Sequence, residues 1–242
     1  MKQLHLPNPF RAAIFYLPEV DSTMRVARSE FGDSPEHGLV ISTGRQSAGR
    51  GRGSGREWQA GQDEGLLCTI LFKRENMKAP VSSIPIRTAL AISRLLKQEF
   101  QLNPLIKWPN DVLVEGKKIC GILCESTSEY VYVGVGLNVL QDGFSSELRK
   151  PATSIFLEGG VRPEPVELLP GLLSELHELL TVVQLPILVQ PWLYRLDEEV
   201  TLLEGDPHSG RLVSGIITGI GESGELRLLQ KSGKIRSLYS GE

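Results

Sequence analysis

Three strand-like runs follow one another in the middle of the chain, at residues 111–115, 119–126 and 129–139. The segments that join them are only a few residues long, whereas a parallel pair of strands needs a crossover of roughly a dozen residues or more. The three runs are therefore predicted to pair antiparallel, with short turns between them. Further apolar runs of strand length lie at residues 12–17, 38–43 and 66–73.

Helical patterns are grouped between these runs. Apolar residues approximate helical spacing over residues 81–100 and again over residues 168–180. A shorter helical pattern follows Asp21 or Ser22, either of which can cap its first turn. The predicted fold class is α+β, with helices on one side of a mixed, largely antiparallel sheet. The sequence lacks the glycine patterns of a dinucleotide-binding fold or a P-loop, so both are disfavoured.

The pattern of the sequence changes after Arg195. Short β-like segments separated by glycine-containing turns, such as Glu222-Ser223-Gly224, follow to the end. We expect a catalytic domain over residues 1–196 and a small β-barrel-like domain over residues 197–242.

The composition of the chain argues against some classes of protein. The chain has 242 residues, with 26 Lys and Arg against 29 Asp and Glu, and a net charge of −3. This balance gives no global basic field of the kind expected for a dedicated nucleic-acid binder. Secretory-signal and transmembrane patterns are lacking, and Cys68, Cys120 and Cys124 follow no zinc spacing. We therefore expect a soluble, cytoplasmic protein whose cysteines are small core residues.

The most unusual segment is the Gly/Arg-rich stretch at residues 44–58, which carries Arg45, Arg50, Arg52 and Arg56. Glycine permits close approach of the backbone, and arginine provides forked donors for carboxylate or phosphate. The pattern predicts an anion-binding loop that closes over a ligand. A solvated loop without a role and an RGG-like contact to RNA are the alternatives.

Two other segments suggest ligand contacts. In KWPNDV, residues 107–112, Lys107 lies near a strand end and can neutralise a carboxylate or phosphate. In GVGLNV, residues 134–139, Gly134 and Gly136 lie within a strand beside Asn138. Glycine at such positions indicates either a bulge or the close approach of a ligand or another backbone.

Taken in order, several motifs resemble those of biotin protein ligases, and the match spans almost the whole chain. They are DST at 21–23, QSAGRGRGSGREW at 46–58, KWPNDV at 107–112, KICGILCE at 118–125, GVGLNV at 134–139, PATSI at 151–155 and SGE at 240–242. The resemblance implies the class II synthetase-like fold of biotin ligases with a small C-terminal SH3-like β-barrel. It also implies a two-step reaction, in which biotin and ATP form biotinyl-5′-AMP and a lysine of a biotin carboxyl carrier domain then receives biotin.

The resemblance also implies site residues. Those for biotin are Ser22, Thr23, Met24, Gln46, Arg50, Gly51, Arg52, Lys107 and Gly121. Those for ATP and the adenylate are Arg52, Trp58, Asn110, Lys118 and Asn138. Lys107 and Arg50 are expected to be catalytic, with Lys107 offsetting the charge of the biotin carboxylate and the α-phosphate. Mg²⁺ is expected with ATP, without assigned protein ligands.

The sequence departs from the family pattern in three ways. The Gly/Arg loop is one residue longer, which affects the placement of Arg56 and Glu57. Met24 stands where the family commonly has asparagine, and the chain ends at Glu242 where the family usually continues through a last short strand.

The expected partners are the carrier domain and the two small molecules, with no membrane, and a homodimer is left open. Because the first catalytic strand begins near residue 12, we expect no N-terminal DNA-binding domain and no DNA binding. Alternatives are a lipoate or octanoate ligase of related fold, an RNA-binding module that uses the Arg-rich loop, and a pseudo-enzyme that binds biotin without ligating it.

Overall fold

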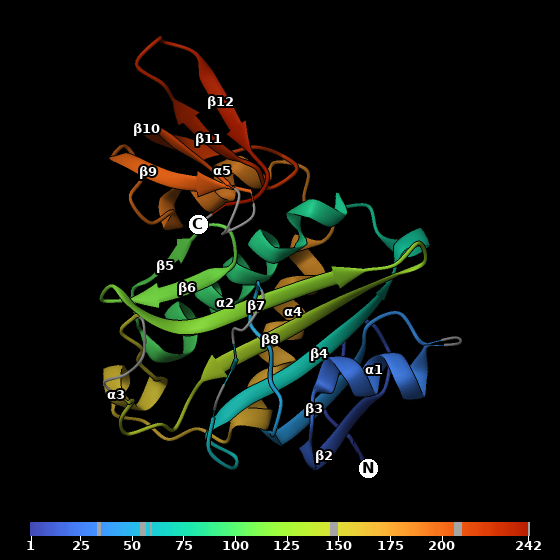
Figure 1. Ribbon diagram of the computed structural model, residues 1–242. Coiled ribbons are helices and arrows are strands. Elements are labelled where there is room, and N and C mark those ends of the chain that lie inside the picture. Colours follow the sequence, from blue (N-terminus) through green and yellow to red (C-terminus); the bar gives the residue numbers. More distant parts are fainter. Residues whose placement is uncertain (33–34, 54–56, 59, 146–149, 206–209, 242) are drawn as a thin grey trace.

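The computed structural model describes residues 1–32, 35–53, 57–58, 60–145, 150–205 and 210–241 (Figure 1). Its main sheet has eight strands in the order β1-β2-β3-β4-β8-β7-β6-β5. They are β1 (Lys2–Leu4), β2 (Ile14–Val20), β3 (Leu39–Gln46), β4 (Gly65–Lys73), β5 (Pro104–Lys107), β6 (Asp111–Val114), β7 (Lys117–Ser126) and β8 (Tyr130–Asn138). The strands β2 and β3 pair parallel, and β6, β7 and β8 pair antiparallel as predicted.

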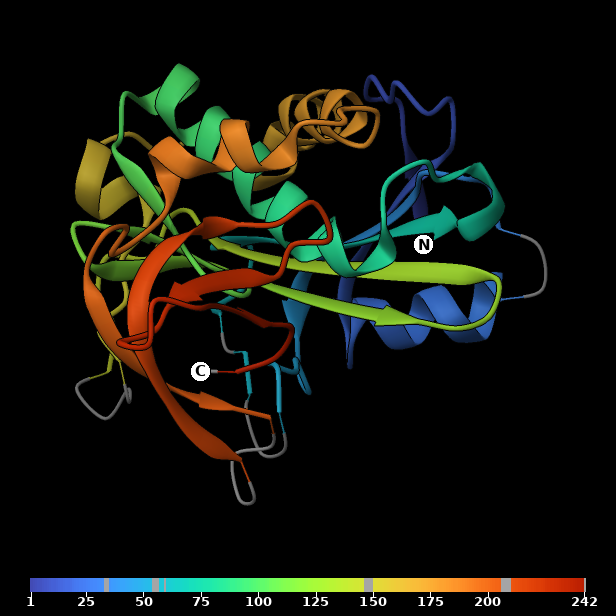
Figure 2. The same ribbon diagram turned by 90° about the horizontal axis from the view of Figure 1, so that it is seen from above.

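Helices cover both faces of this sheet (Figure 2). On one face, α2 (Ile84–Phe100) and α4 (Leu169–Leu179) form the main core with strand residues such as Val40, Ile70 and Val133. On the other face, α1 (Thr23–Phe31) forms a second core whose buried residues are Met24, Val26, Ala27, Leu39, Ile41, Leu71 and Tyr132. The expectation of helices on one side is therefore wrong. Because β3 and β4 are buried on both faces, they lack the alternation that would have marked one side as solvated.

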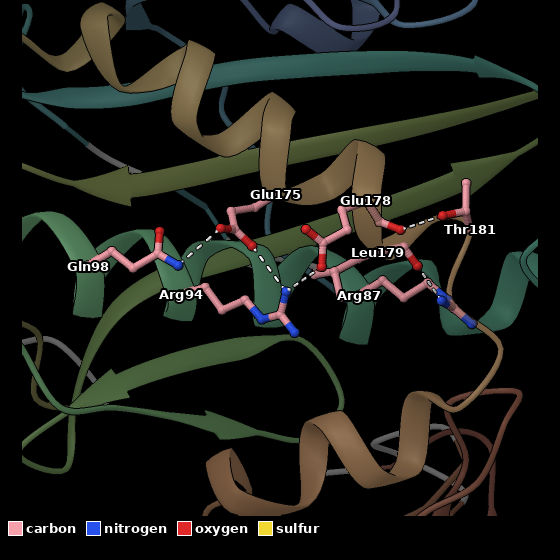
Figure 3. A network of polar contacts seen from close by, with 7 residues as sticks. All are labelled: Arg87, Arg94, Gln98, Glu175, Glu178, Leu179 and Thr181. Carbon is pink, nitrogen blue, oxygen red and sulfur yellow. Dashed lines mark hydrogen bonds and ion pairs between the residues drawn. The ribbon is translucent and has the colours of Figure 1, made fainter.

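A buried arginine joins the two helices of the main core (Figure 3). Arg87 of α2 is 1% exposed, and its guanidinium donates to the carbonyl oxygens of Leu179 and Val182 at the end of α4. Its Nε also donates to Ser83 Oγ at 2.9 Å. The buried charge is thus surrounded by acceptors, and it supplies donors to carbonyls that the end of α4 leaves open.

Shorter helical segments connect these layers. They are η1 (Arg74–Asn76), η2 (Val81–Ser83), α3 (Ile155–Gly159), η3 (Pro165–Leu168), α5 (Leu185–Val189) and η4 (Gln190–Trp192). No helix among the described residues is long and apolar enough to cross a membrane.

The C-terminal strands form a separate antiparallel sheet in the order β12-β11-β10-β9. They are β9 (Glu199–Glu204), β10 (Arg211–Ile220), β11 (Leu226–Leu229) and β12 (Ile235–Leu238). This small sheet lies beside β5, β6 and the start of α2 (Figure 1). Trp108 Nε1 donates to the carbonyl oxygen of Gly224 at 3.0 Å and so links the main sheet to the small one. The arrangement agrees with the predicted SH3-like unit, while the boundary at residue 197 stays a prediction.

Candidate active site

The candidate site lies on the face of the main sheet that carries α1, and its floor is built from glycines. Two rows of directly paired residues cross β4, β8 and β7: Leu67, Gly136 and Gly121, followed by Thr69, Gly134 and Leu123. Directly opposite residues of a sheet share one face, so each row presents a glycine of β8 at its centre. The floor is therefore lowered along β8, which leaves room above it.

A cluster of polar side chains stands on one flank of this floor. The backbone N–H of Thr23 donates to Gln46 Oε1 at 2.8 Å, and the Thr23 hydroxyl lies 3.2 Å from the same oxygen. The Thr23 hydroxyl also lies 2.9 Å from that of Thr69. The start of α1, with Ser22 at its N-cap, places Thr23 here, and the end of β3 places Gln46. We call Thr23, Gln46 and Thr69 the polar cluster.

Two large side chains cover the glycines. An added Cβ on Gly136 would lie 2.4 Å from the Trp58 indole, and one on Gly121 would lie 2.9 Å from it. On Gly134, it would lie 3.1 Å from Met24 Cε. Any side chain at Gly136 would therefore collide with Trp58. Trp58 Nε1 is buried and has no hydrogen-bond partner among the described residues, so it offers a donor inside the site.

Lys118 marks a cationic end of the site beside Gly121, where an added Cβ would lie 2.9 Å from Lys118 Nζ, and Arg50 and Arg52 line the same cavity. Lys118 Nζ lies 2.7 Å from Asp111 Oδ1 and 5.4 Å from the centroid of the Trp58 ring. Arg52 Nη1 donates to the carbonyl oxygen of Gly241 at 3.1 Å. Arg50 forms an isolated bridge with Glu57, within the Gly/Arg loop. Such a cationic end can bind a carboxylate or a phosphate.

These features enclose a cavity of about 160 Å³, and eleven of the thirteen predicted site residues line it. The eleven are Ser22, Thr23, Met24, Gln46, Arg50, Gly51, Arg52, Trp58, Asn110, Lys118 and Gly121. Asn110 is held there because its Nδ2 donates to the carbonyl oxygen of Ile122 at 2.7 Å. Arg56 of the predicted loop lies outside the described residues.

The other two predicted residues do not line this cavity. Lys107 is the last residue of β5, and its backbone is paired with that of Asp111 in β6. Asn138 is 4% exposed, and its Nδ2 donates to the carbonyl oxygen of Thr153 at 2.9 Å. Thr153 N in turn donates to the carbonyl oxygen of Lys118. Asn138 is thus connected to Lys118 through the backbone around Thr153.

Several lining residues were not predicted from the sequence. Thr69, Arg25, Arg28, Leu123 and Glu125 all line the cavity. Arg28 pairs with Glu125, and its guanidinium lies 4.8 Å from the centroid of the Tyr132 ring. The sequence does distinguish Thr69, because it is the one residue with a hydroxyl group in the apolar run at residues 66–72.

The described residues do not offer a metal centre or a reactive thiol. Among them, no three His, Cys, Asp or Glu side chains come together in a way that could hold a metal ion. They therefore offer no ready-made cage for Mg²⁺, which commonly binds through the phosphates of a nucleotide and one or two carboxylates. Burial raises the pKa of the Cys68 thiol to about 12, so this thiol stays protonated at neutral pH.

Comparison with known proteins agrees with this geometry. A sequence profile of the biotin/lipoate A/B protein ligase family matches residues 16–138, which include all three strands of the floor. A biotin–[acetyl-CoA-carboxylase] ligase of Paracoccus denitrificans is 32% identical over 210 residues, which cover 78% of this chain and 83% of that protein. The bifunctional ligase/repressor BirA of Bacillus spizizenii is 30% identical over 154 residues. The chain spans about half the length of this relative and of its Bacillus subtilis counterpart, 47% in each case.

A solved structure extends the likeness to the whole fold. The biotin protein ligase from Aquifex aeolicus, in complex with biotin and ATP, has a TM-score of 0.82 and 28% sequence identity. The match covers 95% of this chain and 96% of that one. It confirms the predicted biotin ligase fold. Because the family profile matches half of the chain and the Paracoccus relative is matched over most of its length, the chain belongs to the biotin/lipoate A/B protein ligase family.

Proposed function

We propose that this protein is a biotin protein ligase, which activates biotin with ATP and transfers it to a lysine of a biotin carboxyl carrier domain. The observation that carries the proposal is that the polar cluster and several cationic groups line the same cavity. Biotin has matching ends, namely a ureido group with N–H donors and a carbonyl acceptor, and a carboxylate on an apolar chain. The names of the relatives support the same assignment.

The first step joins two anions. An oxygen of the biotin carboxylate attacks the α-phosphorus of ATP, the bond to the β-phosphate breaks, and pyrophosphate leaves with biotinyl-5′-AMP as product. Arg50, Arg52 and Lys118 offset the negative charge that accumulates, a stabilisation of about a few kcal/mol. Lys107 and Asn138 belong to the proposal through the family pattern alone.

The second step transfers the acyl group. The neutral amine of the carrier lysine attacks the biotinyl carbonyl carbon, the bond to the phosphate oxygen breaks, and AMP leaves while the amine loses a proton. The mixed anhydride is prone to hydrolysis, so groups that cover it and exclude water protect it. Trp58 and Arg52, which border the cavity, are proposed for this role.

The proposal extends to the metal, the location and the partners. Mg²⁺ enters as the partner of ATP, held by phosphates and water, and a cytoplasmic location is proposed from the sequence. The carrier is proposed from the name of the Paracoccus relative, a biotin–[acetyl-CoA-carboxylase] ligase. The absence of DNA binding stays a prediction for a gel-shift assay, and a homodimer stays open to sedimentation analysis.

The decisive experiment is ATP–pyrophosphate exchange with the purified protein and biotin, run beside lipoate and octanoate. We expect exchange with biotin alone, because the polar cluster has partners for a ureido group and none for a hydrocarbon chain. Exchange with lipoate or octanoate instead would reassign the substrate within the same family. Biotin binding without exchange would favour the pseudo-enzyme, and salt-dependent RNA binding without exchange would favour the RNA-binding module.

A further inference from the structure

The floor of the cavity changes from glycine to tyrosine in one row of the sheet. The row after Thr69, Gly134 and Leu123 consists of Leu71, Tyr132 and Glu125. Tyr132 is 3% exposed, and the guanidinium of Arg28 lies over its ring. The glycine floor therefore ends at this row, where Arg28 and Glu125 line the cavity with side chains that are 43% and 37% exposed.

Met24 stands at this end of the floor. It is 8% exposed and packs into the core under α1, while its Cε lies over Gly134 in the last open row. Leu123 faces the cavity from the same row. We call Met24, Leu123 and Gly134 the apolar wall.

This end of the cavity therefore has two chemically different sides. The polar cluster offers two hydroxyls and an amide, whereas the apolar wall offers no side-chain N–H or O–H. Next to this wall, Arg28 also lines the cavity, and its charge is paired with Glu125. The fused rings of biotin show the same division, because the ureido ring is polar and the other ring contains a thioether.

We propose that Met24 is a specificity-determining residue that selects the reduced thioether of biotin against its S-oxidised forms. The inference rests on the proposed function. A sulfoxide or sulfone oxygen is a strong acceptor, and against the apolar wall it would lose water without gaining a donor. The reduced thioether has no such cost, and it packs well against the polarisable sulfur of methionine.

The test compares kcat/KM for biotin and biotin sulfone in ATP–pyrophosphate exchange, with calorimetric binding of each compound as a second readout. Wild-type protein should prefer biotin by about tenfold or more, because an unpartnered buried acceptor has a cost of this order. Met24→Gln places an amide donor at nearly the same length and should lower the preference about tenfold. Met24→Thr, a smaller polar replacement, keeps the test valid should the glutamine variant not fold.

Two further variants serve as matched controls. Met24→Leu keeps an apolar side chain and should keep the preference. Val26→Ala removes volume from the same helix and the same core, away from the cavity lining, and should also keep it. A preference that falls equally in Val26→Ala would show that general loosening of α1 sets selectivity, and would overturn the assignment to Met24.

The inference and the proposed function fail in different ways. No exchange with biotin by the wild-type protein would overturn the proposed function. Exchange with biotin and equal use of the sulfone would overturn the inference and leave the ligase assignment standing. An unchanged preference in the folded Met24→Gln and Met24→Thr proteins would do the same.

Discussion

At the scale of single residues, the Thr23 hydroxyl is the centre of the polar cluster. It lies within hydrogen-bonding distance of both Gln46 Oε1 and Thr69 Oγ1. Thr23→Val keeps the shape of the side chain and removes this link. We expect the KM for biotin to rise by about tenfold to a hundredfold, since a lost hydrogen bond in a buried polar site has a cost of about 1–3 kcal/mol. Steady-state exchange kinetics measure the change.

The control for Thr23→Val is Thr88→Val, which removes a hydroxyl that donates to the carbonyl oxygen of Ile84 inside α2. Both threonines are buried, but only Thr23 lines the cavity. Thr88→Val should leave the KM for biotin unchanged. Equal effects of the two substitutions would argue against a binding role for the polar cluster.

A second residue, His37, should make stability depend on pH. Burial lowers the pKa of His37 from 6.5, and this effect outweighs the backbone hydrogen bond with Lys73, which raises the pKa. The unfolded chain therefore binds the proton more readily than the folded protein does. The stability that comes from burying neutral His37 is fully present above about pH 6.5 and is lost as the pH falls through the lower folded-state pKa.

Urea denaturation from pH 7.5 to pH 5 measures this effect. The free energy of unfolding should fall with pH in the wild-type protein, and the fall should be smaller in His37→Asn, which cannot be protonated there. His5→Asn, on the exposed N-terminal segment, should keep the wild-type profile. Superimposed profiles for wild-type protein and His37→Asn would contradict the prediction.

The residues of the site were predicted with uneven success, for reasons that lie in the fold. Gln46 and Lys118 are far apart in the sequence, and the family pattern assigned them to one site that the pairing of β4, β8 and β7 now brings together. Asn138 is part of the same pattern, but its amide is turned toward Thr153 inside the protein. A motif identifies which residues belong together, whereas the direction of each side chain depends on which face of its strand is covered.

At the scale of elements, the long and strongly patterned segments were predicted, and the short edge strands were not. β5 has four residues and begins with Pro104, and β1 has three. Neither is long enough to show an alternation of its own, and both depend on a neighbouring strand for pairing. The side of the sheet that α1 covers could not be predicted either. The pattern of an amphipathic helix shows that one face is buried, but it does not show which part of the protein covers that face.

The contact between α2 and α4 supports a prediction about stability (Figure 3). Arg87→Met keeps much of the side-chain volume but leaves the carbonyl oxygens of Leu179 and Val182 without this donor. We expect the free energy of unfolding to fall by about 2–4 kcal/mol, because each buried acceptor left unpaired has a cost of about 1–3 kcal/mol. Chemical denaturation measures it.

Arg94 on the same helix provides the matched control for Arg87→Met. It bridges Glu175 and Glu178 of α4, and its side chain is 20% exposed. Arg94→Met should therefore reduce stability by no more than about 1 kcal/mol. A larger loss for Arg94→Met than for Arg87→Met would show that the ion pairs at the surface, and not the buried guanidinium, hold the two helices together.

At the scale of the whole molecule, the small C-terminal sheet contacts the candidate site. Arg52 of the Gly/Arg loop donates to Gly241, while Trp108 of the KWPNDV segment donates to Gly224. A second cavity of about 230 Å³ lies between the two sheets and shares Arg52 and Asn110 with the first. The C-terminal segment that carries the small sheet therefore contacts Arg52, one of the cationic groups that line the site.

Gly224 allows this close approach, and its replacement tests the coupling. Its φ is +81°, and an added Cβ would lie 2.9 Å from Ser83 Cα and 3.1 Å from Ser82 O at the start of α2. Gly233 has a similar φ of +79° with nothing within 4 Å, so Gly233→Ala gives the backbone strain alone. Gly224→Ala should lose about 1–3 kcal/mol more stability than Gly233→Ala, because it adds a clash with backbone to the same strain. Displacement of the small sheet should also weaken ATP-dependent exchange in Gly224→Ala alone, and equal stability and exchange in the two variants would show that the small sheet does not position the site.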